Sequence, residues 1–348
     1  MKALMILLIC LLSISPGMSK DKKAVFIQTE SFDQKGGWFI DQQSMDVMGS
    51  PYLLAHGMGT PVDDAMTKVV FPEKGKYRVY VRTRNWTAQW SDVPAGRFQV
   101  LIDGKPLDKE FGVSTQEWSW IDGGTVDIKS GVAHVALRDL TGFNGRCDAI
   151  YFTAEKNDVP PNDPDQMDKL VEELTGKKRT VEEGEYDFVI IGGGMAGTCA
   201  AISAARLGVK VALIQNRPVL GGNNSSEVRV HLGARINLEP YPNLGNLVNE
   251  IGPDRGGNAQ PKDYYEDDKK LKAVLAESNI SLFLNTHANK VETKDGKITK
   301  VYAENIETGE IRGFSAPLFA DCTGDGTIGF LAGAEYMTGR ESRDRFNE

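Results

Sequence analysis

Residues 186–215 read YDFVIIGGGMAGTCAAISAARLGVKVALIQ, and this stretch decides the fold of the second half of the chain. The apolar run 188–191 is typical of a strand that is covered on both faces of a parallel sheet. An alanine-rich segment of strong helix formers follows, and the β-branched run 209–214 indicates a second strand. The pattern therefore predicts a βαβ unit in an α/β domain.

A glycine-rich turn joins the first predicted strand to the helix. Gly192, Gly194 and Gly197 have the spacing G-x-G-x-x-G. In dinucleotide-binding units the first glycine makes a tight turn, the second lets a pyrophosphate approach the backbone, and the third lets helix and strand pack closely. The pyrophosphate then lies on free N–H groups at the helix start, here Met195 and Ala196. The βαβ setting favours dinucleotide binding over a purely structural turn.

The position that should bind the ribose departs from the usual pattern. An Asp or Glu is expected at the end of the second strand, but Gln215 stands there, followed by Asn216. An amide can accept and donate hydrogen bonds to ribose hydroxyls, although without charge assistance. We therefore expect Gln215 and Asn216 at the ribose, with a weaker interaction than a carboxylate would give.

Two more glycine motifs follow along the chain. Residues 217–226 read RPVLGGNNSS, and residues 319–326 read FADCTGDG. With the first turn, they resemble the FAD-dependent oxidoreductases of the glutathione-reductase-like type over about residues 186–340. The resemblance implies a Rossmann-like domain with FAD, rather than NAD, as cofactor. The further cofactor contacts that it implies are Gly222, Asn223, Gly324 and Asp325.

An alternating segment, residues 288–304, predicts a β-hairpin around the turn Asp295-Gly296. In the resembling family a small β-meander stands at this place, and its first strand passes the adenine. The resemblance thus implies adenine contacts from the backbone near Ala288 and Val291. A hairpin with a purely structural role is an equally open interpretation for either residue.

The first half of the chain has a different composition, because all the tryptophans fall before residue 121. Short alternating segments with Gly and Asp turns predict an antiparallel β-sandwich over residues 24–154. The strings 71–82, 100–104 and 148–152 resemble carbohydrate-binding jelly rolls of the xanthan-lyase or galactose-binding-like type. The fold expected for the whole chain is therefore a jelly-roll sandwich followed by the FAD-binding domain.

Two tryptophan pairs are candidate glycan contacts in this first domain. Indole presents a flat apolar face and a polar N–H, which suits a sugar ring. Trp86 and Trp90 stand four apart in a polar loop, and Trp118 and Trp120 alternate along one predicted strand. Filling of the sandwich core is the open alternative for either pair.

The sandwich resemblance also implies a structural calcium ion shared by an acidic residue on the first strand and one on the last. Glu30 and Asp148 hold these places. Calcium takes six to eight oxygen ligands, so two carboxylates alone do not define a site. Calcium is therefore expected only as a structural ion beside FAD.

Domain boundaries and location follow from the flanking segments. Residues 1–20 have the charged, apolar and cleavage regions of a secretory signal peptide, which predicts a periplasmic or extracellular protein. The proline-rich and charged stretch 155–185 predicts a linker, and residues 186–348 the FAD-binding domain. Relatives of this type continue beyond the late glycine motif, so we expect either a C-terminally truncated product or an open flavin face.

Charge and hydropathy restrict the partners. The formal net charge of −8 argues against nucleic acid. After the signal peptide no stretch is long and apolar enough for an integral membrane segment. The remaining cysteines give no metal or disulfide pattern. A carbohydrate or polysaccharide is the expected partner.

The chemistry expected at the flavin is hydride transfer, for which the protein orients the substrate. The polar candidates near the ring follow the second glycine motif and are Ser225, Glu227, Arg229, His231 and Arg235. His231 can take a proton from a carbinol, because imidazole titrates near neutral pH, or it can be a structural imidazole. The sequence thus predicts an exported FAD-dependent oxidoreductase acting on a carbohydrate or related alcohol. The alternative is a glycan-binding protein with an incomplete, catalytically silent flavin domain.

Overall fold

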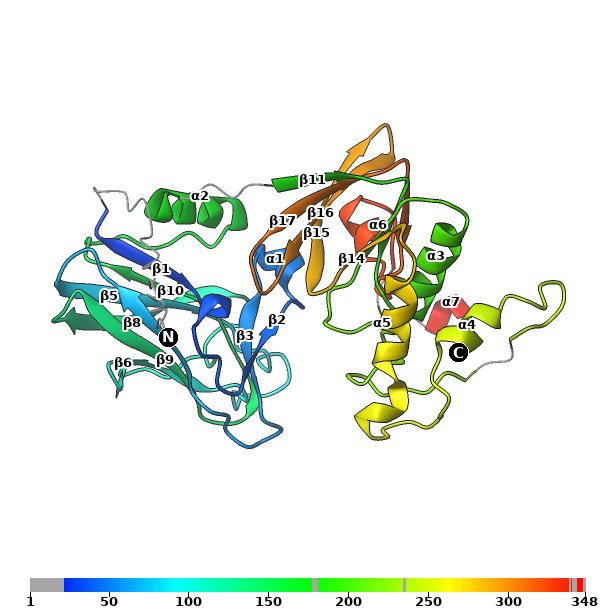
Figure 1. Cartoon of the computed structure of the whole chain (residues 1–348). Helices are drawn as coiled ribbons and strands as arrows, with labels where there is room; N and C mark the ends of the chain where they lie inside the picture. The colour runs from blue at the N-terminus through cyan, green and yellow to red at the C-terminus, as the bar shows by residue number, and fades with distance from the viewer. Residues whose placement is uncertain (1–21, 177–180, 234–235, 338, 340–342, 347–348) are drawn as a thin grey trace, which may run out of the picture. The chain divides into compact units, whose positions relative to one another are not determined.

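The protein is described by a computed structural model that covers residues 22–176, 181–233, 236–337, 339 and 343–346 (Figure 1). The chain divides into two compact units. The first comprises Met1–Phe39 and Tyr52–Arg179, and the second comprises Ile40–Pro51 and Thr180–Glu348. The predicted signal peptide lies outside the described residues. No helix among the described residues is long and apolar enough to cross a membrane.

The first unit is built from two β-sheets. One has the order β2-β3-β10-β5-β8, with β1 also paired to β10, and the other has the order β4-β9-β6-β7. Strand β10 is antiparallel to β1, β3 and β5, and β9 is antiparallel to β4 and β6. The strands are β1 Ala24–Gln28, β2 Trp38–Asp41, β3 Tyr52–His56, β4 Ala65–Val70, β5 Gly75–Thr83, β6 Phe98–Ile102, β7 Lys105–Pro106, β8 Ser119–Ile128, β9 Val132–Asp139 and β10 Phe143–Thr153. The predicted antiparallel sheets are present, and jelly-roll connectivity stays a prediction.

Two tryptophans belong to the core of this unit. Trp38 is 3% exposed and meets the ring of Phe98 edge-on, with centroids 5.7 Å apart. Trp118 is 4% exposed and lies against Tyr52 at 4.8 Å. Burial of an indole contributes more apolar area than almost any other side chain. These two residues therefore stabilise the sheets from inside.

The structure describes two regular elements inside the stretch predicted as a linker, residues 155–185: a helix in the first unit and a strand in the second. Helix α2, Pro164–Thr175, buries Met167, Leu170 and Leu174 on one face. Its N-terminus is capped by Asp163, which accepts a hydrogen bond from the backbone N–H of Gln166 at 3.0 Å. Strand β11, Val181–Glu185, pairs with β17, Ile311–Ser315, in the second unit. Its charged residues face solvent while its backbone is paired, and composition alone does not reveal this.

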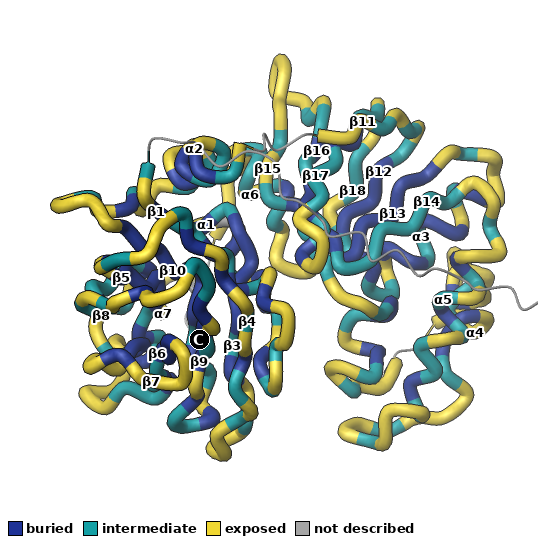
Figure 2. Tube along the Cα trace, turned by 60° about the vertical axis from the view of Figure 1, so that its left-hand side comes forward, coloured by how far each residue is buried: buried dark blue, intermediate teal, exposed yellow. Residues whose placement is uncertain are grey.

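A parallel sheet forms the centre of the second unit, as the apolar runs predict. Its order is β14-β13-β12-β18, and every neighbouring pair is parallel. The strands are β12 Phe188–Ile191, β13 Val211–Ile214, β14 Ile280–Phe283 and β18 Leu318–Asp321. Val189 packs into one apolar cluster and Ile190 into another, so β12 is covered on both faces, and Figure 2 shows β12 and β13 as buried. The helices described in this unit after Thr180 are α3 Met195–Arg206, α4 Asn246–Ile251, η2 Lys262–Tyr265, α5 Asp267–Leu275, α6 Thr327–Leu331 and α7 Arg343–Phe346.

A second sheet of this unit has the order β11-β17-β16-β15. Strands β15, Thr286–Lys294, and β16, Lys297–Asn305, form the predicted hairpin. Asp295 has φ +51° and Gly296 has φ +73°, and a two-residue hairpin turn with both central residues at positive φ suits Asp-Gly. The hairpin prediction is therefore confirmed.

One short segment lies outside the unit that the sequence pattern suggested. Ile40–Pro51 stands between β2 and β3 in the chain, inside the span expected for the sandwich, yet it belongs to the second unit. Helix α1, Met45–Met48, contacts β15 there. Met45 and Met48 are buried. Burial of these apolar side chains holds the segment on the second unit, and a strand-by-strand reading of the sequence could not reveal it.

Candidate functional site

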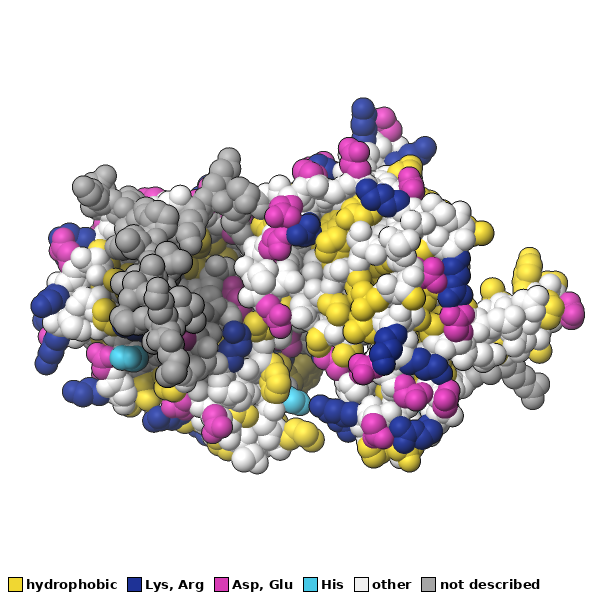
Figure 3. All heavy atoms as spheres, viewed as in Figure 1, with side chains coloured by type: hydrophobic (Ala, Val, Ile, Leu, Met, Phe, Trp, Pro, Cys, Tyr) yellow, Lys and Arg dark blue, Asp and Glu magenta, His cyan; other side chains and the backbone are white. Residues whose placement is uncertain are grey.

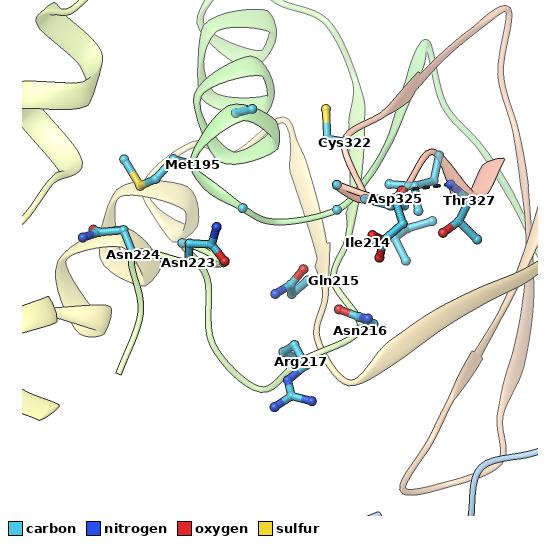
Figure 4. Close-up of a pocket in the computed structure, with 18 of the residues that line it drawn as sticks. Met195, Ile214, Gln215, Asn216, Arg217, Asn223, Asn224, Cys322, Asp325 and Thr327 are labelled. Carbon is cyan, nitrogen blue, oxygen red and sulfur yellow. Dashed lines mark hydrogen bonds between the residues drawn. The ribbon is translucent and has the colours of Figure 1, made fainter. Parts of the chain in front are cut away.

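A cavity of about 640 Å³ lies at the carboxyl ends of β12 and β13 in the second unit (Figure 4). Ligand sites of open parallel sheets occur at such strand ends. Residues of all three glycine motifs line it, and those predicted as cofactor contacts are Gly192, Gly194, Met195, Ala196, Gln215, Asn216, Gly222, Asn223, Ala288, Gly324 and Asp325. Figure 4 shows Met195 and Asn223 on one side of the view and Asp325 on the other, with Gln215 between them. The structure thus brings together segments that are far apart in the sequence.

Two predicted contacts do not line the cavity. Gly197 is buried in α3, in the packing role expected of the third glycine. Val291 packs against the apolar cluster that contains Val301 and Ala303. This packing supports the hairpin interpretation of Val291, and an adenine contact from the backbone near it stays a prediction.

Two glycines of the first turn are required by the protein's own atoms. Gly192 has φ +105°, and a Cβ there would lie 2.1 Å from the carbonyl oxygen of Cys322. A Cβ at Gly197 would lie 1.9 Å from the carbonyl oxygen of Gly192. No side chain tolerates either approach. These glycines therefore hold the first turn tightly against the late motif and against α3.

Gly194 is different, because nothing in the protein requires a glycine there. Its φ of −63° suits any residue, and the nearest atom to a Cβ would be the Cα of Gly222, 4.0 Å away. A side chain would instead take up space in the cavity that Gly194 lines. Helix α3 begins directly after it without a side-chain cap, so the first N–H groups of the helix are available to an anion. This arrangement fits the pyrophosphate of a dinucleotide.

Gln215 has a role that the sequence did not predict. It is 4% exposed, its Oε1 accepts a hydrogen bond from Gly193 N at 2.7 Å, and its Nε2 donates to Val219 O at 2.9 Å. The amide therefore ties the glycine turn to the loop after β13. An Asp or Glu could accept the first bond but could not donate the second. This explains an amide at a position where relatives of the predicted type carry an acid.

Asp321 organises the late glycine motif and was missed by sequence reasoning. Its Oδ1 accepts from the backbone N–H and the hydroxyl of Thr323, at 3.1 and 2.7 Å. Its Oδ2 accepts from Ile328 N and Gly329 N, at 2.9 and 3.0 Å, in the first turn of α6. Four hydrogen bonds to one carboxylate fix the loop that carries Gly324 and Asp325. Asp321 ends β18 and lies five residues before Gly326, the N-cap of α6, so the usual N-cap pattern does not point to it.

Of the polar candidates after the second glycine motif, His231 lines the cavity. Its backbone N and its Nδ1 lie 2.9 and 2.7 Å from Oδ1 of Asn258. Glu227 pairs instead with Arg217 at 2.8 Å, and Arg229 donates to a backbone carbonyl at 3.1 Å. The contacts of Ser225 are likewise local, since its hydroxyl accepts from the N–H of Glu227 at 3.3 Å, and Arg235 lies outside the described residues.

The first tryptophan pair lies at the surface of the first unit. The rings of Trp86 and Trp90 meet edge-on with centroids 6.2 Å apart, and Trp90 is 72% exposed. Trp86 is held by a hydrogen bond from its Nε1 to Phe143 O at 3.0 Å and by the guanidinium of Arg146, 5.2 Å from its ring centre. The structure therefore leaves an open indole at Trp90, beside a fixed one.

The second tryptophan pair has packing contacts inside the first unit, and for Trp118 these support the core interpretation. Trp118 is buried in the core against Tyr52. Trp120 packs on Phe26, and its Nε1 donates to Pro161 O at 2.8 Å. Trp118 is therefore buried and Trp120 partly buried, and a glycan contact from Trp120 stays a prediction.

The two carboxylates of the predicted calcium site have other surroundings. Asp148 Oδ2 lies 2.9 Å from Nη1 of Arg82, and both side chains are 2% exposed. A guanidinium thus already neutralises this carboxylate. Among the described residues no group of three or more His, Cys, Asp or Glu is arranged to hold a metal ion. Calcium at Glu30 and Asp148 stays a prediction.

Burial raises the pKa of the thiols of Cys147, Cys199 and Cys322. A raised pKa keeps a thiol protonated at neutral pH and therefore a poor nucleophile. All three cysteines are free. Cys322 lines the cavity, where it serves as a small apolar wall.

The second unit is similar in sequence to proteins of known families. Residues 187–348 match the family model of the FAD dependent oxidoreductases. The chain is 29% identical over 163 residues to dihydrolipoamide dehydrogenase of Chaetomium thermophilum, which covers 41% of this chain and 32% of that protein. It is 41% identical over 79 residues to aerobic glycerol-3-phosphate dehydrogenase of Staphylococcus aureus, which covers 22% of this chain and 14% of that protein. The chain therefore spans a third or less of the length of these relatives.

Solved structures give more distant likenesses. Mycobacterium smegmatis Sdh1 in the apo form has a TM-score of 0.32 at 18% identity, over 40% of this chain and 34% of that one. A family 35 carbohydrate binding module from Clostridium thermocellum has a TM-score of 0.30 at 18% identity, over 37% of this chain and 96% of that one. Both are too distant to identify a function. The family match over residues 187–348, with the cavity that its motifs line, shows FAD as the cofactor of this region.

Proposed function

We propose that this chain is an exported flavoenzyme that oxidises a carbohydrate or a related secondary alcohol. The observation that carries the proposal is that three separate segments of the family match line one cavity. Bound FAD supplies the hydride acceptor for such an oxidation. The relatives named dehydrogenases also support oxidation of a small substrate.

The chain's own residues have separable tasks in this proposal. The first turn of α3, at Met195 and Ala196, would hold the pyrophosphate, with Gly194 leaving room for it. Gly222 and Asn223 would hold the cofactor from the loop after β13, and Gly324 from the late motif. Gln215 and Asp321 keep these loops in place and are positioning residues.

Oxidation of an alcohol also releases the hydroxyl proton, which needs an acceptor. We assign this task to His231, because it lines the cavity and an imidazole changes charge near neutral pH. The proton would move from the substrate oxygen to the unprotonated ring nitrogen.

A carbohydrate is the proposed substrate class because of the exposed tryptophan pair in the first unit. An open indole face at Trp90 offers apolar contact to a sugar ring, and the guanidinium of Arg146 lies beside Trp86 for hydroxyl groups. Export is proposed from the segment 1–20 alone. An exported chain would meet polysaccharide directly, which agrees with this substrate class.

The test starts from the full chain secreted to the periplasm. The released cofactor is identified after denaturation, and the visible flavin absorbance is then followed without oxygen while oligosaccharides and secondary alcohols are added. The expected result is loss of that absorbance with a sugar or secondary alcohol of the panel, and no loss with the corresponding oxidised product. A flavin that no member of the panel reduces would contradict oxidation of this substrate class.

A second candidate function is glycan binding with a catalytically silent flavin domain. The exposure of Trp90 favours it, because this surface does not depend on the flavin cavity. Polysaccharide binding by a protein without FAD would support this candidate. Loss of polysaccharide binding in Trp90→Ala, with FAD retained, would tie the glycan to the tryptophan pair. Equal binding by wild type and Trp90→Ala would exclude that pair as the glycan site.

A further inference from the structure

The inference concerns Asn258, which no sequence motif singled out. Its Oδ1 lies 2.9 Å from the backbone N of His231 and 2.7 Å from Nδ1 of the same residue. A backbone N–H can only donate, so the atom that it meets must be the amide oxygen and not the amide nitrogen. The same oxygen therefore accepts from Nδ1. It follows that Nδ1 carries a proton.

We propose that Asn258 is a positioning residue that holds the imidazole of His231 in the Nδ1–H tautomer. In a neutral imidazole one ring nitrogen donates and the other accepts. The Nδ1–H tautomer therefore leaves Nε2 as the acceptor. The inference rests on the proposed function, in which His231 takes the hydroxyl proton of the substrate, and it names the atom that receives this proton.

Asn258 is itself held in place by a buried tyrosine. The Tyr265 side chain is 1% exposed, and its hydroxyl lies 2.6 Å from Arg229 O and 2.9 Å from Gly257 O. These two carbonyls belong to the segments that carry His231 and Asn258. The tyrosine thus joins both segments at one buried point. The contact between His231 and Asn258 is therefore part of the loop's architecture and not a chance meeting of two exposed side chains.

Gly233 keeps the other side of the ring uncovered. A Cβ at this position would lie 2.8 Å from Nε2 of His231. Any side chain there would press on the nitrogen that the Asn258 contact leaves as the acceptor. With glycine at this position that close contact with the acceptor nitrogen is absent, and His231 lines the cavity.

Long-range proton–nitrogen NMR of the full chain, labelled at its four histidines, tests the proposal directly. The spectrum is taken at about pH 8.5, where a free imidazole is neutral. His231→Gln identifies the signals of His231. The expected result is an Nδ1–H ring in the wild type, loss of that form in Asn258→Ala, and its retention in Asn258→Asp, which keeps an acceptor. An Nε2–H ring in the wild type, or an unchanged ring in Asn258→Ala, would overturn the proposal.

His56 provides a matched control in the first unit, because its Nδ1 lies 2.6 Å from Oδ1 of Asn144. Its signals should not change in the Asn258 variants. If Asn258→Ala changes the signals of His56, the fold itself is disturbed and the test then uses Asn258→Asp. Loss of the Nδ1–H form of His231 in Asn258→Asp would contradict the proposal. The proposed function is tested separately. If His231 has an Nδ1–H ring but the protein oxidises no alcohol, the assignment of the tautomer holds and the proposed function is wrong.

Discussion

The glycine turn of the second unit and the tryptophan pairs of the first unit were equally prominent in the sequence, but the structure uses them in different ways. Backbone contacts fix the places of Gly192 and Gly197 in the turn. Among the tryptophans, Trp118 is buried and Trp90 is exposed, although both carry the same side chain. A motif whose spacing follows from backbone geometry therefore predicts where its residues lie in the fold. A residue type without such a constraint, such as tryptophan, does not predict whether its side chain is buried or exposed.

The largest expected effect separates the two tryptophans. Trp118→Ala should lower the free energy of unfolding of the first unit by about 3–5 kcal/mol, because it leaves a cavity among buried aromatic rings. Trp90→Ala should change it by less than about 0.5 kcal/mol, because the indole is mostly in solvent. Urea unfolding followed by circular dichroism measures both. Equal losses in the two variants would contradict the assignment of Trp118 to the core.

Gly197→Ala should have the next largest effect and should act on the second unit. The new methyl group would meet the carbonyl oxygen of Gly192, and relief of such overpacking costs about 1–3 kcal/mol. Thermal unfolding in the absence of FAD measures the loss. Stability equal to that of the wild type would show that the turn is looser than the structure indicates.

Gly194→Ala is the matched variant in the same turn and should separate binding from folding. Its methyl group meets no protein atom closer than 4.0 Å, so stability should change by less than about 0.5 kcal/mol. The dissociation constant of FAD should rise about tenfold or more, a cost of about 1.4 kcal/mol, because the methyl group stands where the pyrophosphate approaches. Titration of FAD fluorescence gives the constant. An unchanged constant would remove the pyrophosphate from this position.

Much of the second unit could be predicted from sequence because its signals are local. The apolar run of β12 and the Asp295-Gly296 turn each report on neighbours along the chain. The roles of Gln215 and Asn258 could not be predicted in this way, because their partners are backbone atoms of other loops. For the same reason the sequence could not predict that the segment Ile40–Pro51 belongs to the second unit, since its burial depends on a strand distant in the sequence.

The charged surface shows how the charged stretch predicted as a linker can contain a regular element. Figure 3 shows Lys and Arg side chains interspersed with Asp and Glu over the face in view. A charged stretch on such a surface is compatible with an ordered element, as in β11, where Glu182 pairs with Arg312 at 2.8 Å. Net charge therefore describes solvation and not the absence of structure.

The smallest expected effect comes from an exposed ion cluster on the second unit. The guanidinium of Arg206 lies 2.6 Å from Glu250 and 2.7 Å from Glu277, and its hydrogen bond lowers the pKa of Glu250. A carboxyl whose pKa is lowered by folding contributes stability above its unfolded pKa of about 4.3, and this contribution is lost as pH falls through the folded value. Because Arg206 and Glu250 are about half exposed, the contribution of this pair should stay below about 1 kcal/mol.

Arg206→Gln tests this pH dependence. Its unfolding free energy should lie slightly below that of the wild type at pH about 7, and the difference should be smaller at pH about 3, because the stabilisation is lost as pH falls through the folded pKa of Glu250. Urea unfolding at the two pH values measures the difference. A difference that persists undiminished at the lower pH would show that the arginine acts through packing and not through charge.

The account depends most on FAD occupying the cavity between the three glycine motifs. Extraction of the cofactor from purified full-length wild type and Gly194→Ala, under identical conditions, tests this directly. The account predicts FAD in near-equimolar amount from the wild type and a marked loss from a Gly194→Ala protein that is equally well folded. A folded wild type that holds no FAD and binds none on titration, or equal FAD content in both proteins, would contradict it.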